Sequence, residues 1–275
     1  MIRFFDGGMG SMLNLAAGEL PEKLNISEPE RVFAVHKGYA DAGAEFITAN
    51  TFGANSLKYD NVDELVKAGV ALAKKAGKYV ALDIGPTGKL LKPMGDLEFE
   101  RAVELFAEVV RAGKDGSDVA IIETMSDMYE LKAAVIAVKE NSDLPIITSM
   151  IFDESGRLLT GGDVKSAVAM LEGLRVDAIG FNCGLGPKQM IPLVKELREC
   201  TSLPILVMPN AGLPESVDGK TVYNVSPDEF AQDMREIAKL GVSILGGCCG
   251  TTPKHIAKMI ELCKDIPDNL SLIHI

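Results

Sequence analysis

The sequence predicts a single-domain (β/α)8 TIM barrel of the α/β class. Eight short apolar runs alternate with eight amphipathic stretches, and no linker or low-complexity segment divides the 275 residues. About 250 residues is a usual length for one such barrel. We therefore expect the barrel to occupy residues 1–264 and residues 265–275 to form a C-terminal tail.

The eight apolar runs are short, rich in β-branched residues and without strict alternation of apolar and polar positions. This pattern is typical of strands that are buried on both faces of a parallel sheet. The predicted strands are Arg3–Phe5, Phe46–Ala49, Tyr79–Leu82, Val119–Ile122, Pro145–Met150, Ala178–Phe181, Ile205–Met208 and Ser243–Leu245.

The stretches between these strands carry the end signals of helices. Ser226 and Thr252 each precede a proline, which is the arrangement of an N-cap residue followed by the first helical position. Gly43 and Gly77 stand where a helix often ends in a left-handed glycine. The predicted helices are Pro29–Ala42, Val62–Ala76, Leu97–Ala112, Met128–Glu140, Val164–Leu174, Lys188–Glu199, Pro227–Leu240 and Pro253–Cys263.

The charge of the chain excludes some classes of function. The 28 Lys and Arg residues against 39 Asp and Glu residues give a net charge of −11, which repels a phosphate backbone, so we expect no nucleic-acid partner. No apolar run reaches the roughly 18–20 residues of a membrane span, and the first residues do not resemble a signal peptide. We therefore expect a cytoplasmic protein without membrane contact.

A barrel of this kind carries its chemistry at the C-terminal ends of its strands. Any single polar residue there could simply begin a loop, but polar or thiol groups at all eight strand ends favour a site at this rim. The groups are Asp6-Gly7-Gly8, Asn50-Thr51, Asp83, Glu123-Thr124, Ser149, Asn182-Cys183, Asn210 and Cys248-Cys249, and the long loops Gly8–Ser27 and Ala211–Val225 lie on the same side.

The cysteines are the most informative part of this rim. Cys183 follows the sixth predicted strand, and Cys248 and Cys249 follow the eighth, so three thiols should point into one mouth. Three thiolates with one open position match a catalytic zinc site. A vicinal disulfide or small buried apolar side chains are the alternatives, because adjacent ligands are not the usual C-x2-C signature. We expect Cys200 and Cys263, which lie on or beside helices, to be packing residues.

The ligand type indicates the chemistry. Zinc held by three thiolates retains little charge to polarise water, but it can bind an incoming thiol and keep it a nucleophilic thiolate, which points to alkyl transfer onto sulfur. Asp6, Asp83 and Glu123 could recognise an ammonium group, and the backbone of Gly7 and Gly8 could approach a carboxylate closely. These features together describe a thiol amino acid as the substrate. The three histidines lie off the rim, so histidine acid–base catalysis is not expected.

Several motifs carry a family resemblance. The segments Asp6–Ser11, Asn50–Asn55, Glu123–Met125, Asn182–Pro187 and Gly246–Pro253 closely resemble the zinc-dependent homocysteine S-methyltransferase family. The resemblance extends from residue 5 to about residue 262, with Ser11 where threonine would be expected. Together with Pro21–Asn25, the motifs look most like the homocysteine-binding module of cobalamin-dependent methionine synthase.

The resemblance implies a (β/α)8 barrel whose Cys183, Cys248 and Cys249 hold Zn²⁺, with the sulfur of homocysteine as a further ligand. It also implies that Asp6 and Glu123 bind the amino acid and that the backbone around Gly7 and Gly8 holds its carboxylate. With the rim positions, the expected substrate-binding set is Asp6, Gly7, Gly8, Asn50, Thr51, Asp83, Glu123, Ser149 and Asn182. The expected activity is methyl transfer to homocysteine, giving methionine.

The methyl donor is less defined by the sequence. The two long loops contain no aromatic residue except Tyr223, and the chain has no Trp, so an aromatic cage for a small sulfonium donor is not evident. This favours methylcobalamin on a separate corrinoid protein or in another part of a longer chain. The alternatives are S-methylmethionine or S-adenosylmethionine as donor, a corrinoid-linked methyltransferase acting on another substrate, and a barrel that stores or senses zinc.

Overall fold

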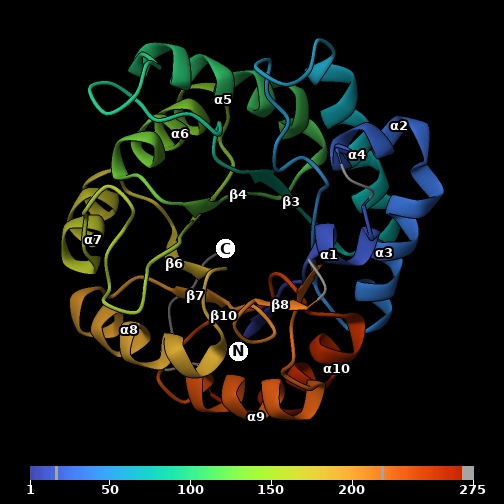
Figure 1. The fold of residues 1–275 in the computed structure, drawn as a ribbon, viewed down its shortest axis with the longest axis vertical. Helices are drawn as coiled ribbons and strands as arrows, with labels where there is room; N and C mark the ends of the chain where they lie inside the picture. Colours follow the sequence, from blue (N-terminus) through green and yellow to red (C-terminus); the bar gives the residue numbers. More distant parts are fainter. Residues whose placement is uncertain (16–17, 218–219, 268–275) are drawn as a thin grey trace.

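The computed structural model describes residues 1–15, 18–217 and 220–267, and these residues form the expected barrel (Figure 1). Eight parallel strands are hydrogen-bonded in the order β1-β10-β7-β6-β5-β4-β3-β2, with helices around them. The strands are β1 Arg3–Phe4, β2 Phe46–Thr48, β3 Tyr79–Ile84, β4 Val119–Met125, β5 Ile146–Met150, β6 Ala178–Asn182, β7 Ile205–Met208 and β10 Ile244–Leu245. All eight predicted strands are confirmed.

The barrel is brought close to closure where its first two strands meet. Phe5 and Phe46 form an isolated parallel bridge, and the backbone N–H of Glu45 donates to the carbonyl of Phe4 at 2.8 Å. The rings of Phe5 and Phe46 stack with their centroids 4.8 Å apart. On the other side β1 pairs with β10, so the first and last strands of the barrel are neighbours.

The eight predicted helices are confirmed, with ends within two residues of the predicted positions. They are α3 Pro29–Asp41, α4 Val62–Ala76, α5 Phe99–Gly113, α6 Met128–Asn141, α7 Val164–Gly173, α8 Pro187–Cys200, α9 Pro227–Ala238 and α10 Pro253–Cys263. Ser226 caps α9 as predicted, because its side chain accepts from the backbone N–H of Glu229. Gly43 is left-handed with φ +101°, also as predicted.

Gly77 follows the end of α4 as predicted, but the predicted left-handed conformation was wrong. Its φ is −121°, which is ordinary extended backbone and not the left-handed conformation. A Cβ at this position would lie 2.2 Å from Cγ1 of Ile47, so it is crowding against β2 that requires a glycine here.

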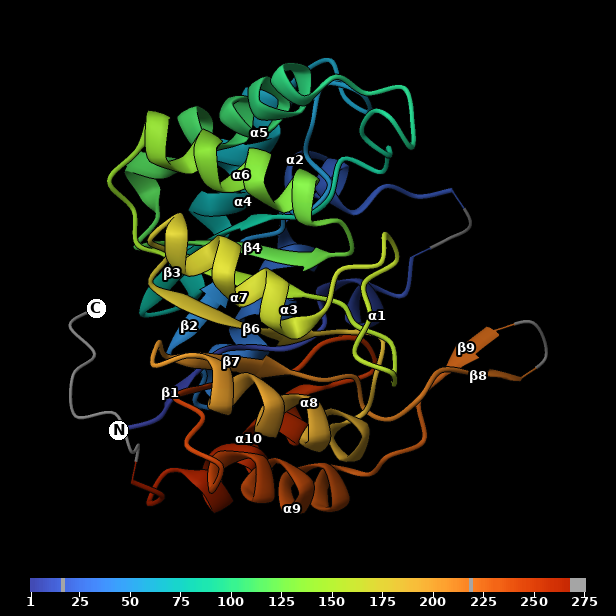
Figure 2. The ribbon, with the colours of Figure 1, turned by 90° about the vertical axis from the view of Figure 1, so that its left-hand side faces the viewer.

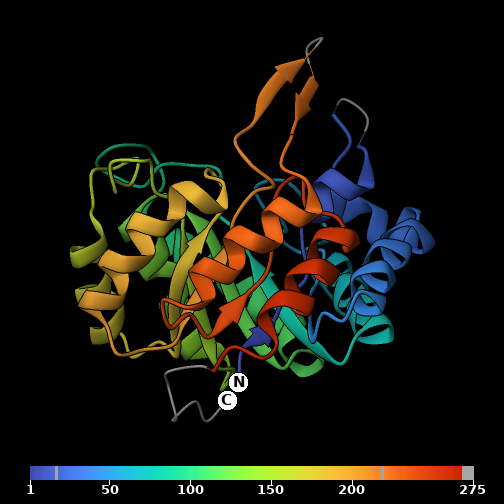
Figure 3. The ribbon, with the colours of Figure 1, turned by 90° about the horizontal axis from the view of Figure 1, so that it is seen from below.

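The two long segments of the rim contain elements that the sequence did not predict. The first holds α1 Met9–Leu13, the 3-10 helix η1 Pro21–Lys23 and α2 Leu24–Ser27, and the second holds a hairpin of β8 Glu215–Val217 and β9 Lys220–Val222. The hairpin projects from the mouth of the barrel, at the end opposite the N-terminus (Figures 2 and 3). Each element is too short to show a helical or strand periodicity in the sequence.

The strands divide their side chains between two apolar layers. Side chains from every strand region, among them Phe5, Ile121 and Leu206, form a cluster of their own, while the alternate positions pack in the larger cluster with the helices. This explains why the strands read as continuous apolar runs, since both faces are buried. Within the described residues, no helix combines the length and hydropathy that a membrane span requires. Residues 268–275 of the expected tail lie outside the described part of the chain.

Gly180 in β6 tests how tightly this barrel is packed. A Cβ there would lie 2.0 Å from the carbonyl oxygen of Leu206 in β7, so we expect Gly180→Ala to lower the free energy of unfolding by about 1–3 kcal/mol or more. Gly173 at the end of α7 has open space around its Cβ position, and Gly173→Ala should raise stability by up to about 1 kcal/mol. Urea unfolding of both variants measures the difference, and equal midpoints would contradict the close approach of the two strands.

Candidate active site

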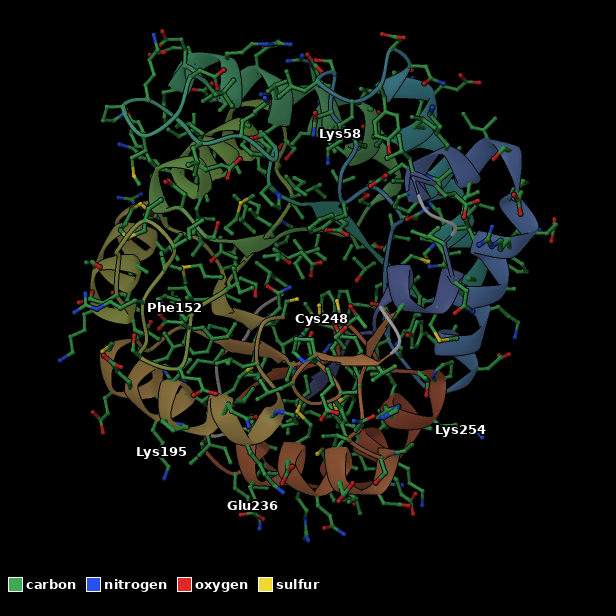
Figure 4. The ribbon with its side chains drawn as sticks, in the orientation of Figure 1. Lys58, Phe152, Lys195, Glu236, Cys248 and Lys254 are labelled. Atoms are coloured by element: carbon green, nitrogen blue, oxygen red, sulfur yellow. The ribbon has the colours of Figure 1, made fainter. Side chains whose placement is uncertain are left out.

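Three thiols meet at the mouth of the barrel. Cys183 follows β6, Cys248 and Cys249 follow β10, and the three sulfur atoms all lie within 4.8 Å of one another. The sulfurs of Cys183 and Cys249 are 3.9 Å apart. Cys248 lies inside the ring of helices, whereas Lys195, Glu236 and Lys254 lie on its outside (Figure 4). The structure thus brings together the cysteines that the sequence singled out.

Backbone hydrogen bonds fix the two segments that carry these thiols. The N–H of Cys183 donates to the carbonyl of Met208 at 3.2 Å, and the N–H of Cys248 donates to the carbonyl of Pro209 at 2.8 Å. Cys183 has φ +59°, a conformation that costs a non-glycine residue free energy and is found mainly where surrounding contacts enforce it. The positions of the sulfurs are therefore set by the ends of neighbouring strands.

The arrangement fits a tetrahedral thiophilic metal ion. Zn–S bonds of about 2.3 Å place the sulfurs of a tetrahedral site about 3.8 Å apart, close to the separation of Cys183 and Cys249. Within the described residues, no fourth cysteine, histidine or carboxylate belongs to this cluster, so one position stays open. Asn210, at the neighbouring strand end, adds a buried side-chain oxygen without a hydrogen-bond partner.

Without a metal, the three thiols cannot share the same ionisation state. Hydrogen bonds from the thiols of Cys183 and Cys248 lower the pKa of Cys249 to about 3. Hydrogen bonds with Cys183 and Cys249, together with burial, raise the pKa of Cys248 well above its ordinary value. A cation is needed for all three to be thiolates at neutral pH, as in a metal site.

Tyr223 is a site residue whose role the sequence did not indicate. It follows the hairpin, and its side chain is among the groups that lower the pKa of the Cys249 thiol. Gly250 makes this contact possible, since a Cβ at that position would lie 2.3 Å from the ring of Tyr223. The only sequence signal was an aromatic residue in a long rim loop.

A cavity of about 240 Å³ lies beside the thiols. Its wall includes the three cysteines and the apolar side chains of Met9, Phe52 and Met208. Of the expected substrate-binding residues, Asp6, Gly7, Gly8, Asn50, Asp83 and Glu123 line it, and so does Glu22, which the sequence reasoning did not select. Glu22 follows no strand end, but it stands in the Pro21–Asn25 motif.

Burial dominates the electrostatics of the cavity. It raises the pKa of Asp6 to about 7 and the pKa of Glu123 to about 8, and it raises the pKa of Asp83 well above its usual range. The negative charge of Asp6 adds to the effect on both other carboxyl groups. These shifts mark a cavity whose negative charge lacks a compensating cation.

Asn182 and Ser149 are fully buried behind the cavity wall. The side-chain oxygen of Asn182 accepts from the N–H of Thr124 and the hydroxyl of Ser149, both at 2.8 Å, and its NH₂ group donates to Oγ1 of Thr124 at 2.7 Å. The same NH₂ group lies 3.9 Å from the sulfur of Cys248. Thr124 has φ +60° at a register shift in β4, directly after Glu123, so Asn182 holds the irregular strand that presents this carboxyl group.

Other rim residues serve the framework in the structure. The hydroxyl of Thr51 donates to the carbonyl of Asp83 at 2.8 Å, so it fixes the end of β3. Gly8 packs tightly, because a Cβ there would lie 2.6 Å from the carbonyl oxygen of Cys248, and its N–H donates to Oγ1 of Thr251 at 3.1 Å. Gly7 is confined in the same way, because a Cβ at this position would lie 2.5 Å from Oγ1 of Thr251.

The remaining histidines and cysteines lie away from the cavity, as expected. His36 is buried in α3, where burial lowers its pKa to about 4, and His255 accepts from the backbone N–H of Thr252 at the start of α10. Cys200 ends α8, and Cys263 is buried in the core at the end of α10. His274 lies outside the described residues.

Comparison with known proteins agrees with this geometry. The family model named homocysteine S-methyltransferase matches residues 3–263. The methionine synthase of Mycobacterium leprae (strain TN) is 32% identical over 294 residues, covering 94% of this chain and 24% of that protein. That of Mycobacterium tuberculosis (strain ATCC 25618 / H37Rv) is 32% identical over 292 residues, covering 95% and 24%. The chain thus spans about a quarter of the length of these relatives.

Solved structures show the same fold. The metallated form of the homocysteine methyltransferase MmuM from Escherichia coli has a TM-score of 0.79 at 23% identity, covering 94% of this chain and 95% of that chain. The apo form of the same protein has a TM-score of 0.75 at 25% identity, covering 95% of both chains. The barrel and the thiols at its mouth agree with the family match. The chain belongs to the homocysteine S-methyltransferase family.

The raised pKa of Glu123 makes stability depend on pH. A carboxyl group whose pKa rises from 4.5 to about 8 on folding stabilises the protein below pH 4.5, and this contribution is lost as the pH rises through 8. Between pH 5 and pH 9 the metal-free protein should lose about 2–4 kcal/mol of unfolding free energy that the Glu123→Gln variant retains. Glu100→Gln, which removes an exposed carboxylate on α5, should follow the parent chain. Parallel pH profiles for all three proteins would show that folding does not raise the pKa of Glu123.

Proposed function

We propose that this chain transfers a methyl group to the thiol of homocysteine, giving methionine, with Zn²⁺ held by Cys183, Cys248 and Cys249. The observation that carries the proposal is the convergence of three thiols within 4.8 Å beside a cavity lined by carboxyl groups. Zinc bound there would supply the Lewis acidity that keeps the substrate sulfur a thiolate at neutral pH. The acidic wall favours binding of the ammonium group of an amino acid, and the thiols mark the place where its sulfur would bind.

The residues of the chain bind and orient the substrate in this proposal. Asp6 and Glu123 attract the ammonium group, and the backbone around Gly7 and Gly8 lies where the carboxylate would enter. Asn182 and Ser149 act from behind the wall, because they hold the strand that carries Glu123. A fixed distance between the ammonium site and the thiols holds the sulfur in line with an incoming methyl group.

The transfer itself needs few groups from the protein. The thiol proton passes to solvent water before transfer. The S–CH₃ bond then forms as the bond between the methyl group and its donor breaks, with its electron pair remaining on the donor. Met9, Phe52 and Met208 give the cavity an apolar lining that limits water around the thiolate. No histidine of the described chain lines the cavity, which agrees with a reaction that requires no general base at the carbon centre.

The donor that we propose is methylcobalamin carried by a corrinoid protein or by another part of a longer chain. Leu90, Met94 and Leu159, on the loops after β3 and β5, are exposed apolar side chains of the kind that a large partner could cover. Tyr223 is the one aromatic residue in the described part of the two long rim segments, and it acts on the pKa of Cys249. The cytoplasmic location stays a prediction.

The metal assignment predicts the behaviour of individual cysteine variants. The isolated protein should contain about one zinc ion per chain, and Cys248→Ala should lose both metal and methyl transfer, since two thiolates hold Zn²⁺ poorly. Cys200→Ala, which removes a thiol from the end of α8, is the matched control and should keep both. Metal analysis and methionine formation are the measurements, and full zinc content in the Cys248 variant would refute the site.

The donor assignment is tested by a panel of methyl donors. Methylcobalamin, S-methylmethionine, S-adenosylmethionine and betaine are each offered with homocysteine, and methionine is measured. We expect slow turnover with free methylcobalamin and almost none with the small onium donors, because the described cavity has no aromatic cage for a cation. Efficient turnover with S-methylmethionine would refute the corrinoid donor and leave the zinc and homocysteine assignments in place.

A further inference from the structure

Cys248 and Cys249 are adjacent in the chain, which is an unusual arrangement for two ligands of one metal ion. In an extended segment successive side chains point to opposite faces, so neighbouring thiols would diverge. Zinc sites commonly separate paired cysteines by two or more residues. In this chain the two sulfurs nevertheless lie within 4.8 Å of each other and of the sulfur of Cys183. The local backbone must therefore turn both thiols toward one point.

A tight turn gives the backbone this shape. It runs from Cys248 to Thr251, and the N–H of Thr251 closes it by donating to the carbonyl of Cys248 at 3.1 Å. Gly250, the third residue, has φ +78°, which matches a type II turn, where glycine is favoured at this position. The two cysteines occupy the first and second positions, so the chain bends at the thiols and does not continue as a strand.

The hydroxyl group of Thr251 closes the same turn a second time. It donates to the carbonyl of Cys248 at 2.7 Å, and it accepts from the N–H of Gly8 at 3.1 Å. One hydroxyl group therefore ties the first cysteine of the turn to the segment after β1, although Gly8 precedes Thr251 by 243 residues. Thr251 is fully buried, so water cannot replace these bonds if the hydroxyl is removed.

Tyr39 of α3 holds the other side of Thr251. Its hydroxyl group lies 2.9 Å from the carbonyl oxygen of Thr251 and 3.2 Å from that of Gly8. A hydroxyl group has one hydrogen to donate, so the shorter distance identifies Thr251 as the main acceptor. The Tyr39 side chain is itself fully buried, and a Cβ on Gly7 would lie 2.9 Å from it. Helix α3 thus fixes the turn against the end of β1.

Ser11 forms a second bridge between the same two segments. Its hydroxyl group accepts from the N–H of Gly250 at 3.2 Å and donates to the carbonyl of Gly8 at 3.3 Å. Ser11 is exposed, so water can replace both bonds at little cost. The buried bridge through Thr251 therefore contributes more to the order of the turn than the exposed bridge through Ser11.

We propose that Thr251, supported by Tyr39, is a positioning residue of the metal site. Its hydroxyl group fixes the turn in which the sulfurs of Cys248 and Cys249 face one point, so that both can bind the ion together with Cys183. The inference rests on the proposed function, because it takes these three thiols to hold Zn²⁺. Groups that orient metal ligands from behind typically change the affinity by about 10- to 100-fold.

The hydroxyl group of Thr251 would act on metal binding through the order of the turn. Without it, the N–H of Gly8 loses its partner, and the carbonyl of Cys248 keeps only the backbone bond that closes the turn. The metal ion would then have to order a looser turn when it binds. The cost of this ordering would lower the affinity, even though all three thiols are still present.

Competition with a chelator measures the zinc affinity of the variants. Thr251→Val keeps the shape of the side chain without its hydroxyl group, and it should weaken zinc binding by about 10- to 100-fold. Thr251→Ser keeps the hydroxyl group and should bind zinc nearly as tightly as the parent chain. Tyr39→Phe removes one neutral hydrogen bond and should weaken zinc binding by about 2- to 10-fold.

Thr148→Val is the matched control for the loss of a buried threonine hydroxyl group. Thr148 lies in β5, is fully buried, and donates to the carbonyl of Ala178 at 3.1 Å. The variant should lose stability in urea unfolding and keep the zinc affinity of the parent chain. An equal loss of zinc affinity in Thr148→Val and Thr251→Val would refute the inference, because a general loss of packing would then explain both.

Cobalt substitution adds a readout that a merely structural role would not change. Co²⁺ bound to thiolates absorbs by charge transfer from sulfur, and the intensity follows the number of bound thiolates. At saturating Co²⁺, Thr251→Val should absorb less than the parent chain, and Thr251→Ser should restore the absorption. A parental zinc affinity or a parental cobalt spectrum in Thr251→Val would refute the inference. If this variant does not fold, a parental zinc affinity in Tyr39→Phe would refute it instead.

The two proposals fail in different ways, because the metal measurements require no methyl donor. If the parent chain binds no zinc, the proposed function is wrong and the role of Thr251 falls with it. If the parent chain binds zinc and methylates homocysteine while Thr251→Val binds zinc equally well, the function stands and only the positioning role is wrong.

Discussion

The burial of acidic groups at the mouth of the barrel is the constraint on which the rest of the site depends. Three thiols and four carboxyl groups surround one cavity, and water can solvate few of them. The chain relieves part of this cost with neutral donors, such as the hydroxyl groups of Thr48 and Tyr59. The rest of the burial cost can be relieved only by a ligand that carries positive charge. The acidic groups of the site are therefore fully compensated only when such a ligand is bound.

The sequence was sufficient to predict the strands and helices of the barrel, but it was insufficient to predict the short elements of the rim. Strands such as Ile205–Met208 are buried on both faces, so their apolar runs identify them without tertiary information. The helix Met9–Leu13 and the hairpin strand Glu215–Val217 have only 5 and 3 residues, and neither contains a full period of any pattern. Short elements of this kind are fixed by contacts with the barrel and not by their own composition.

The site was predictable where a residue type and a strand end coincide. Cys183 and Asp83 were selected in this way, because the C-terminal ends of all the strands meet at the mouth of a barrel. Glu22 was missed because a 3-10 helix carries it into the cavity, away from any strand end. The structure also separates side chains that the sequence could only group together: Asn182 supports the wall from behind, whereas Glu123 faces the cavity. Which way a rim side chain points depends on irregularities such as Thr124 with φ +60°.

The two parts of the thiol cluster are made at different times on the ribosome. Cys183 follows β6, and Cys249 lies 66 residues later in the chain, after the strand that pairs with β1. A nascent chain that has released only the first six strands of the barrel offers a metal ion a single thiol, which is a poor ligand set. All three thiols come together only once the last strand has docked between β7 and β1. The complete set of three thiols is thus a product of barrel closure and not of any single segment of the chain.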